Sequence, residues 1–246
     1  MFLKFTNLSK FQEIEHLITT KDSSKDANFS LALHTGENTE VILKNRAEIS
    51  KQFQPESTFI SLLQTHSSRV FKVESRESIG WEEKSQIEAD ALITDLRGVV
   101  LTILTADCVP ILLFEPEKRT VGAIHSGWRG TEKNIVKETI KKMQNEYQIS
   151  TDKLIVGVAP SIRSCCYEVG VEVARVFESY QDAVVKRDGS YYLDVATVVI
   201  AQLRELGVLQ ENIELSPSCT SCCNKTLFSY RKDKTAGRFM SMLMLK

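Results

Sequence analysis

The sequence predicts an α+β fold, a layered sandwich formed by a single domain over residues 1–246. Short aliphatic runs fill the middle of the chain, and segments with helical spacing flank them. Because the helices do not alternate strictly with the strands, a doubly wound parallel sheet is not expected. A chain of 246 residues can bury a sufficient core unaided, and no internal repeat or Pro/Gly/Ser-rich linker divides it.

The expected elements follow in order along the chain. A solvated helix is expected over 35–53, where Ile42, Ile49 and Phe53 recur at helical spacing. Aliphatic runs bounded by turn-forming residues predict strands over 58–64, 69–73, 89–94, 99–107, 110–114 and 120–124. Beyond them we expect a helix over 131–147 capped by Thr131, a strand over 153–160, a helix over 169–180, and a helix over 194–206 capped by Asp194.

Charge and composition exclude several classes of partner. There are 31 Lys and Arg residues against 32 Asp and Glu, and this net charge of −1 argues against nucleic acid or an anionic membrane as a partner. The N-terminal segment lacks the continuous apolar core of a signal peptide, so a cytoplasmic protein is expected. Its six cysteines are then reduced thiols, available as core residues, metal ligands or nucleophiles.

The stretch TADCVPILLF places Asp107 and Cys108 side by side within an apolar run. A cysteine there is most often a small buried hydrophobic residue, whereas a buried carboxylate needs a partner. Successive side chains of an extended strand face opposite ways. The two residues can therefore serve one site only if the chain bends, and Pro110 favours a bend here.

Two histidines, His66 and His125, lie near the ends of predicted strands, as does Cys108. Two imidazoles and a thiolate suit zinc, and three protein ligands leave the open fourth position of a catalytic site. The ligands are too far apart in sequence for spacing alone to decide. The segment HSGWRG further suggests an anion contact by Arg129, or else a turn in which Trp128 is a plug and Arg129 an ion-pair partner. His16 and His34 are interpreted as surface residues.

The motifs ADALIT, TADCVPILL and AIHSGWRG, with QTHSSRV, CYEVG and FSYRKDKTAGR, resemble the bacterial laccase-domain family. This family is also called multicopper polyphenol oxidoreductase or peptidoglycan editing factor, and is now described as zinc-dependent purine nucleoside phosphorylases. The resemblance runs from about residue 28 to the C-terminus. It implies two mixed β-sheets packed face to face and flanked by helices, with His66, Cys108 and His125 binding zinc. A multicopper centre would need many more histidines than the four present.

The resemblance also implies the reaction. Adenosine, inosine, guanosine and S-methyl-5'-thioadenosine would be cleaved by phosphate to a free base and a pentose 1-phosphate, with adenosine deamination as a second activity. Zinc would polarise the attacking oxygen, which makes Cys108 and His125 catalytic as well as ligating. Phosphate needs fixed positive charge, for which Arg129, Arg231 and Arg238 are the candidates. Asp107 would either orient a ligating histidine or act as a general base.

Other interpretations remain open at this stage. Cys108 could be a nucleophile with His125 as its base, giving a hydrolase that acts in peptidoglycan precursor editing. The protein could instead bind purines or metal without catalysis. The remaining cysteines, Cys165, Cys166, Cys219, Cys222 and Cys223, include one CxxC half-site of a structural zinc centre. Because a matching second CxxC is missing, reduced thiols are the favoured interpretation of this group.

Overall fold

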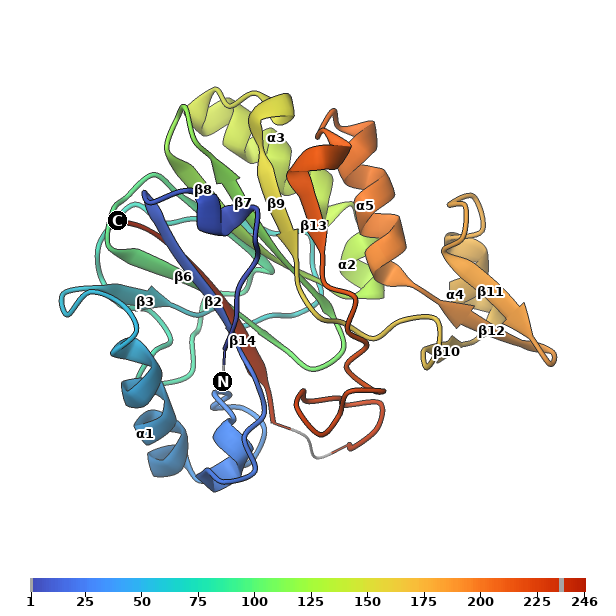
Figure 1. Cartoon of the computed structure of the whole chain (residues 1–246), viewed down its shortest axis with the longest axis horizontal. Coiled ribbons are helices and arrows are strands. Elements are labelled where there is room, and N and C mark those ends of the chain that lie inside the picture. Colours follow the sequence, from blue (N-terminus) through green and yellow to red (C-terminus); the bar gives the residue numbers. More distant parts are fainter. Residues whose placement is uncertain (1, 235–236) are drawn as a thin grey trace.

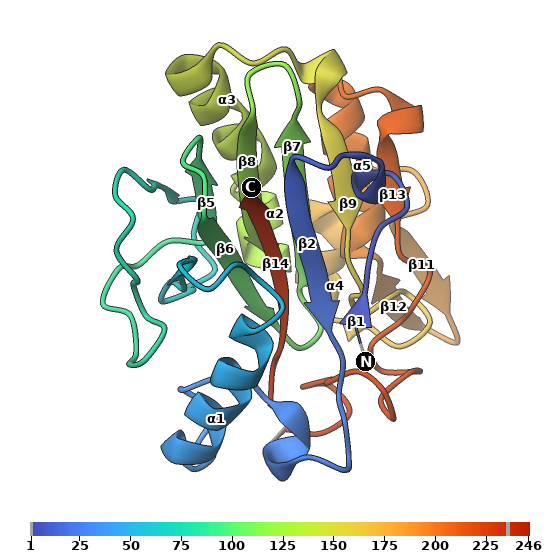
Figure 2. The same cartoon turned by 60° about the vertical axis from the view of Figure 1, so that its left-hand side comes forward.

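Two large mixed β-sheets pack face to face in the computed structural model, which describes residues 2–234 and 237–246. Helices cover the outer face of each sheet (Figures 1 and 2). The predicted α+β sandwich of two mixed sheets is therefore confirmed.

The first sheet has five strands in the order β1-β2-β14-β6-β3. Its pairs are antiparallel except β3 with β6, which is parallel. Because β14 at the C-terminus lies between β2 and β6, residues from both ends of the chain meet in this sheet (Figure 2). The strands are β1 (Phe2–Leu3), β2 (Ile14–Thr19), β3 (Thr58–Ile60), β6 (Val99–Thr105) and β14 (Phe239–Leu245).

The second sheet has six strands in the order β13-β9-β7-β8-β5-β4. Its central strands β7 and β8 form an antiparallel hairpin, and the parallel pairs lie at its two edges. The strands are β4 (Val70–Lys72), β5 (Ala91–Thr94), β7 (Val109–Glu115), β8 (Thr120–Ser126), β9 (Ile155–Val158) and β13 (Ile213–Leu215).

A small third sheet projects from the second one (Figure 1). It consists of β10 (Glu168–Val169), β12 (Ser190–Leu193) and β11 (Val184–Arg187) in that order. The helices are α1 (Thr39–Ser50), α2 (Trp128–Glu132), α3 (Ile135–Tyr147), α4 (Val171–Val176) and α5 (Val195–Glu205). Short 3-10 turns lie at Leu8–Lys10, Asp26–Phe29, Thr151–Lys153 and Gln210–Asn212.

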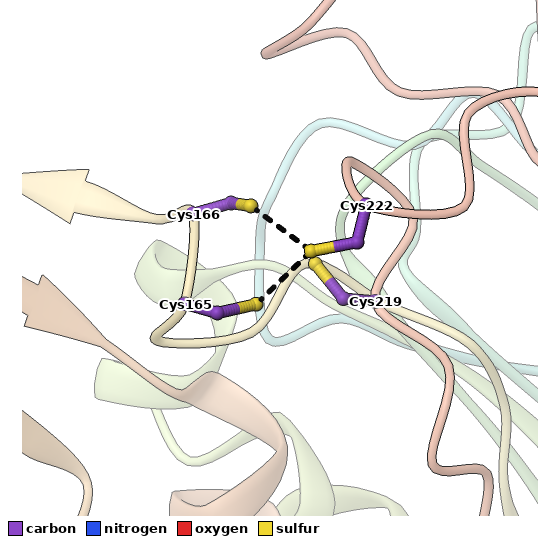
Figure 3. A group of neighbouring side chains, drawn as sticks. All are labelled: Cys165, Cys166, Cys219 and Cys222. Atoms are coloured by element: carbon purple, nitrogen blue, oxygen red, sulfur yellow. Dashed lines mark hydrogen bonds between the residues drawn. The ribbon is translucent and has the colours of Figure 1, made fainter.

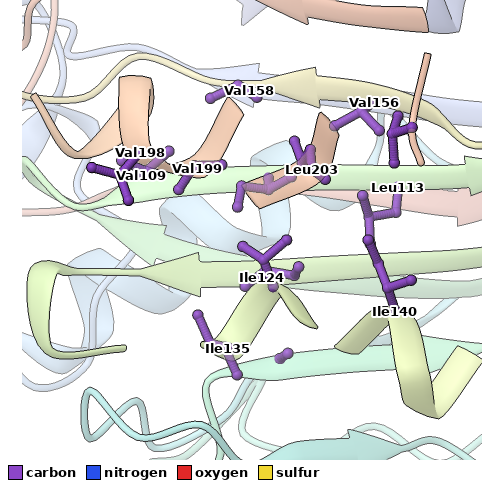
Figure 4. Close-up of a cluster of buried hydrophobic side chains, with 14 of the residues drawn as sticks. Val109, Leu113, Ile124, Ile135, Ile140, Val156, Val158, Val198, Val199 and Leu203 are labelled. Atoms are coloured by element: carbon purple, nitrogen blue, oxygen red, sulfur yellow. The ribbon is translucent and has the colours of Figure 1, made fainter. Parts of the chain in front are cut away.

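Three apolar layers hold this arrangement together. The layer between the two sheets includes Leu101 and Ile103 from β6, and Leu112 and Phe114 from β7. A second layer joins the other face of β7 to α3 and α5 (Figure 4). A third joins the other face of β6 and β14 to α1. Strands covered on both faces must be apolar at nearly every position, which explains the continuous aliphatic runs of the sequence.

All the predicted strands and helices of the middle of the chain are present, with two corrections. The helix after HSGWRG does not begin at Thr131, because that residue lies in α2 and its hydroxyl donates to the Gly127 carbonyl at 2.9 Å. Asn134 occupies the position before α3 in a left-handed conformation, and its side chain makes no capping hydrogen bond. The helix expected over 169–180 shortens to α4, because Val169 pairs with Tyr191 in the small sheet. The Asp194 cap is confirmed, since its carboxylate accepts from the Thr197 backbone N–H at 3.2 Å.

Candidate metal centre and pocket

The chain bends where the acid and the thiol adjoin, between the two sheets. Asp107 connects β6 to β7 and has a φ of 98°, a left-handed conformation that side chains rarely adopt. The expected bend is present, but Asp107 makes it and not Pro110, which lies inside β7 paired with His125. A left-handed residue at the turn lets Asp107 and Cys108 serve the same region. Strained backbone of this kind concentrates at functional sites.

The structure brings His66, Cys108 and His125 together. One ligand atom from each lies within 4.8 Å of the others. The Cys108 Sγ atom is 3.6 Å from Nε2 of His66, and the two imidazole rings meet edge to face with 4.9 Å between their centroids. Three residues that lie far apart in the sequence thus converge on one point.

Local structure explains how His66 reaches this point. The Gln64 side chain pairs with the backbone of Leu104, accepting from its N–H at 2.9 Å and donating to its carbonyl at 2.8 Å. This side chain continues the contact of β3 with β6 after the strand itself has ended. His66 then takes a left-handed conformation, with a φ of 59°, which turns its ring toward Cys108.

Gly127 leaves the space in which these side chains meet. A Cβ atom at this position would lie 2.7 Å from Cδ2 of His66 and 3.0 Å from Sγ of Cys108. Such contacts are shorter than real side chains tolerate, so this position of HSGWRG requires glycine. The absence of a side chain at Gly127 is part of the construction of the site.

Asp90 joins two residues of the cluster, although no motif of the sequence assigned it a role. It is fully buried, and its Oδ1 atom accepts from Nδ1 of His125 at 2.8 Å and from the backbone N–H of His66 at 3.0 Å. The other oxygen accepts from the hydroxyl and the backbone N–H of Ser67, both at 2.6 Å. The sequence does contain a signal for Asp90, since a carboxylate directly before the buried strand of ADALIT needs hydrogen-bond partners.

The Cys108 thiol and the His125 imidazole shift each other's pKa. Burial alone raises the pKa of Cys108, but the charge of His125 and hydrogen bonds from His125 and His66 outweigh it and lower the pKa to about 6. Burial alone lowers the pKa of His125, but the Cys108 thiolate and the Asp90 hydrogen bond raise it to about 9. The two shifts act together and favour the thiolate and the imidazolium. A thiolate is the form in which cysteine binds metals or attacks electrophiles.

These residues fit a metal ion with nitrogen and sulfur ligands. Asp90 occupies Nδ1 of His125, which leaves Nε2 as the ring nitrogen available for a metal. Two imidazoles and a thiolate are typical donors for zinc, and three of them leave one position open. Histidine rings held by a carboxylate in this manner recur at zinc sites.

Asp107 does not contact the histidines in the way one sequence interpretation required. Its Oδ1 atom accepts from the Thr220 hydroxyl at 2.6 Å, and its Oδ2 atom accepts from the backbone N–H of Arg231 at 2.6 Å. The histidine orienter is Asp90, so that role of Asp107 was wrong. Asp107 instead ties the bend between the sheets to the C-terminal segment that carries Arg231.

Two pockets meet at Cys108 and His66. The first, of about 270 Å³, is also lined by Asp107, Arg129 and Arg231. The second, of about 440 Å³, also contains His125, and its further lining comes from His34, Leu62, Leu63, Leu104, Tyr230 and Arg238. The three arginines are therefore divided, two on one side of the cluster and Arg238 on the other. Thr235 and Ala236 of the same C-terminal motif lie outside the described residues.

The arginines differ in their surroundings. Arg129 is exposed and stacks on Trp128, 4.4 Å from its ring centroid, with no carboxylate partner among residues 2–234 and 237–246. The ion-pair interpretation of Arg129 is thus wrong within the described chain. Arg231 donates to the Glu168 carbonyl at 2.9 Å and lies 5.0 Å from the Tyr167 ring centroid.

The two remaining histidines differ in their exposure to solvent. His34 is exposed, as predicted, at the edge of the larger pocket. His16 was expected at the surface, but it lies buried in β2, where its Nε2 accepts from the backbone N–H of Phe5 at 2.8 Å. The apolar residues that surround it in β2 explain the burial. Among the described helices, none is long and apolar enough to cross a membrane.

Comparisons with known proteins agree with this fold. The sequence profile described as multi-copper polyphenol oxidoreductase laccase matches residues 15–246. A purine nucleoside phosphorylase of Clostridium acetobutylicum is 36% identical over 234 residues, covering 90% of this chain and 94% of that protein. One of Aquifex aeolicus is 34% identical over 208 residues, covering 85% and 93%.

Solved structures show the same architecture. The hypothetical protein YfiH of Bacillus licheniformis superposes with a TM-score of 0.88 at 27% identity, covering 95% of this chain and 93% of that one. YlmD of Geobacillus stearothermophilus gives the same TM-score at 28% identity, covering 96% and 93%. With the profile match over nearly the whole chain, this protein belongs to the multi-copper polyphenol oxidoreductase laccase family, which includes the YfiH and YlmD proteins.

Proposed function

We propose that this protein is a zinc-dependent purine nucleoside phosphorylase. The observation that carries the proposal is the cluster of His66, Cys108 and His125 at the junction of two pockets. The names of its relatives in Clostridium acetobutylicum and Aquifex aeolicus support the same activity. Adenosine, inosine, guanosine and S-methyl-5'-thioadenosine are the proposed substrates, with adenosine deamination as a further activity.

The division of charge suggests how the two substrates are arranged. Arg129, Arg231 and Lys234 line the smaller pocket, which suits the oxygens of phosphate. The larger pocket combines the aliphatic side chains of Leu62, Leu63 and Leu104 with a few polar groups, as small-molecule sites commonly do. We therefore assign phosphate to the smaller pocket and the nucleoside to the larger one, with the metal ligands between them.

In phosphorolysis a phosphate oxygen forms a bond to C1' of the sugar while the bond from C1' to the base nitrogen breaks. The electron pair of that bond leaves with the base, which takes up a proton. Zinc, when bound to the three ligands, supplies positive charge that polarises an oxygen nucleophile. Arg129 and Arg231 would hold the phosphate in place. Asp107 would keep Arg231 in position through its backbone N–H, and it remains the candidate general base of the site.

The same site would support deamination if water occupies the place of the phosphate. The attack would then fall on C6 of adenine, and ammonia would leave. Both reactions require the same three ligands, so removal of the metal should affect them together. The larger pocket must accept the base in two poses, one for each reacting carbon.

One experiment tests the assignment directly. Purified protein is incubated with adenosine, inosine, guanosine or S-methyl-5'-thioadenosine, with and without phosphate. Free base should appear with an equal amount of pentose 1-phosphate, and only when phosphate is present. Equal release of base and free pentose in phosphate-free buffer would show hydrolysis and end the phosphorylase assignment.

A second candidate function is favoured by one observation, the proximity of Cys108 to His125, whose charge lowers the pKa of the thiol. A thiolate beside an imidazolium is the arrangement of cysteine hydrolases, and peptidoglycan precursors would then be the substrates. Such an enzyme would work without metal. A protein that binds purine or metal without any turnover is the third alternative, and the nucleoside assay excludes it as soon as product forms.

A further inference from the structure

A second group of cysteines gathers near the bend at Asp107, whose carboxylate accepts from the hydroxyl of Thr220, next to Cys219. One sulfur from each of Cys165, Cys166, Cys219 and Cys222 lies within 4.8 Å of the other three. Cys222 is at the centre, with its Sγ atom 3.5 Å from that of Cys165 and 3.3 Å from that of Cys166 (Figure 3). In Figure 3 the four side chains extend from two separate loops toward one point.

Each loop is built to present two thiols at once. Cys165 and Cys166 lie in a turn closed by backbone hydrogen bonds of 2.9 Å from Cys166 and Tyr167 to the Arg163 carbonyl. Successive residues of a turn need not face opposite ways as they do in a strand. The turn therefore supplies the pair of ligands that a second CxxC would supply. The missing second CxxC, which favoured simple reduced thiols in the sequence, is no obstacle in the structure.

The other loop carries the CxxC of Cys219 and Cys222. Its turn is closed by the Cys223 backbone N–H, which donates to the Cys219 carbonyl at 2.9 Å. The two loops are joined by the Thr220 N–H, which donates to the Ser161 carbonyl at 3.1 Å. Backbone contacts thus fix the spacing between the two pairs of thiols independently of the sulfurs.

We propose that Cys165, Cys166, Cys219 and Cys222 bind one structural zinc ion as a tetrathiolate. A zinc–sulfur bond of 2.3 Å places the sulfurs of a tetrahedral site about 3.8 Å apart, close to the separations observed here. A disulfide needs about 2.05 Å and joins only two sulfurs, which leaves the other pair of this cluster unexplained. Four protein ligands leave no open position, so the ion would be structural and not catalytic.

The location indicates what this ion would stabilise. Thr220, inside the CxxC loop, donates its hydroxyl to Asp107, and the Ile162 N–H donates to the Asp107 carbonyl at 2.9 Å. Tyr167, which follows the cysteine pair, lines the smaller pocket. The zinc would therefore fasten the wall of this pocket to the bend at Asp107. The four-cysteine site does not depend on the proposed function, whereas a total of two zinc ions per chain also requires the proposed ion at His66, Cys108 and His125.

Metal analysis tests the proposal. The full chain, purified without oxidants and dialysed to remove loosely bound ions, should contain two zinc ions per chain. Cys222→Ser and Cys165→Ser should each contain one, and so should Cys108→Ala, while Cys108→Ala combined with Cys222→Ser should contain none. Cys223→Ser is the matched control, because this neighbouring thiol is outside the four-cysteine cluster, and it should keep both ions.

Spectroscopy and thiol labelling identify the ligands even where a variant folds poorly. Wild-type protein loaded with Co²⁺ should show sulfur-to-cobalt charge-transfer absorption that Cys108→Ala largely retains and that Cys222→Ser reduces to the contribution of Cys108. Alkylation of the four thiols should be slow until a chelator is added. Unchanged zinc content in Cys222→Ser, rapid alkylation of the four thiols without a chelator, or a disulfide among them detected by mass spectrometry would each overturn the proposal.

Discussion

Asp90 holds His125 by two hydrogen bonds, one from the ring and one from the backbone. Nδ1 of His125 donates to the Asp90 carboxylate at 2.8 Å, and the His125 backbone N–H donates to the Asp90 carbonyl at 2.7 Å. The same carboxylate oxygen receives the backbone N–H of His66. A single buried residue therefore sets the positions of two of the three proposed metal ligands.

Asp90→Asn should weaken zinc binding at the three-ligand site by about 10- to 100-fold, the usual cost of losing a carboxylate behind a ligating histidine. The shape of the side chain is kept, but the charge that supports the His125 ring is removed. Competition with a chromogenic chelator measures the affinity. Asp107→Asn is the matched control, because this carboxylate contacts Thr220 and Arg231 instead, and it should keep the metal while losing rate. Equal zinc affinity in wild type and Asp90→Asn would contradict the assigned role.

Gly127→Ala should disrupt the same site by crowding. The added methyl would lie 2.7 Å from Cδ2 of His66 and 3.0 Å from Sγ of Cys108, so these side chains must move apart. Overpacking of this kind lowers the free energy of unfolding by about 1–3 kcal/mol. Here it would also displace the proposed metal ligands His66 and Cys108. We expect a lower zinc content and a loss of turnover with little change in the far-ultraviolet circular dichroism. Gly130→Ala, in the same segment but with 3.2 Å to its nearest neighbour, should affect both far less. Full activity in Gly127→Ala would show that the ligands do not need this space.

The predicted layers were right because aliphatic runs covered on both faces leave a clear pattern in sequence. The terminal strands β2 and β14 were missed because pairing between the two ends of the chain leaves no local signal. The same limit applies to the site. His66, Cys108 and His125 could be proposed from strand ends and from the family resemblance, whereas the contact between Asp90 and His125 depends on the β5–β8 register. The cluster of four cysteines likewise depends on two loops meeting in space.

Cys108 is expected to act as a ligand and not as a nucleophile. Chelation should then abolish nucleoside cleavage, and added zinc should restore it, because the thiolate and the two imidazoles regain their ion. Cys108→Ser should lose the ion of this site and the activity together. Activity is followed in the chelated and the reconstituted enzyme, with intact-mass spectra taken during turnover. Full activity of the metal-free enzyme, or a covalent adduct on the Cys108 sulfur, would instead support the hydrolase alternative.

His16 should make the stability of the fold depend on pH. Burial, followed by the charge of Lys4, lowers its pKa to about 4 from the usual 6.5. The neutral ring accepts from the Phe5 N–H, so the unfolded state binds a proton more readily than the folded state as pH falls. The stabilisation is thus complete above about pH 6.5, declines as the pH falls toward 4, and amounts to about 3 kcal/mol over that range.

Urea unfolding of the wild type and of His16→Gln at pH 7 and at pH 4.5 tests this contribution. The glutamine oxygen can accept the same N–H but does not titrate, so the free energy of unfolding should fall less in the variant than in the wild type over this interval. Both proteins should be measured either with saturating metal or after complete removal of metal, because the proposed metal ligands bind and release protons as well. An identical decrease in the two proteins would show that other groups account for the acid sensitivity, and that protonation of His16 costs the folded state nothing.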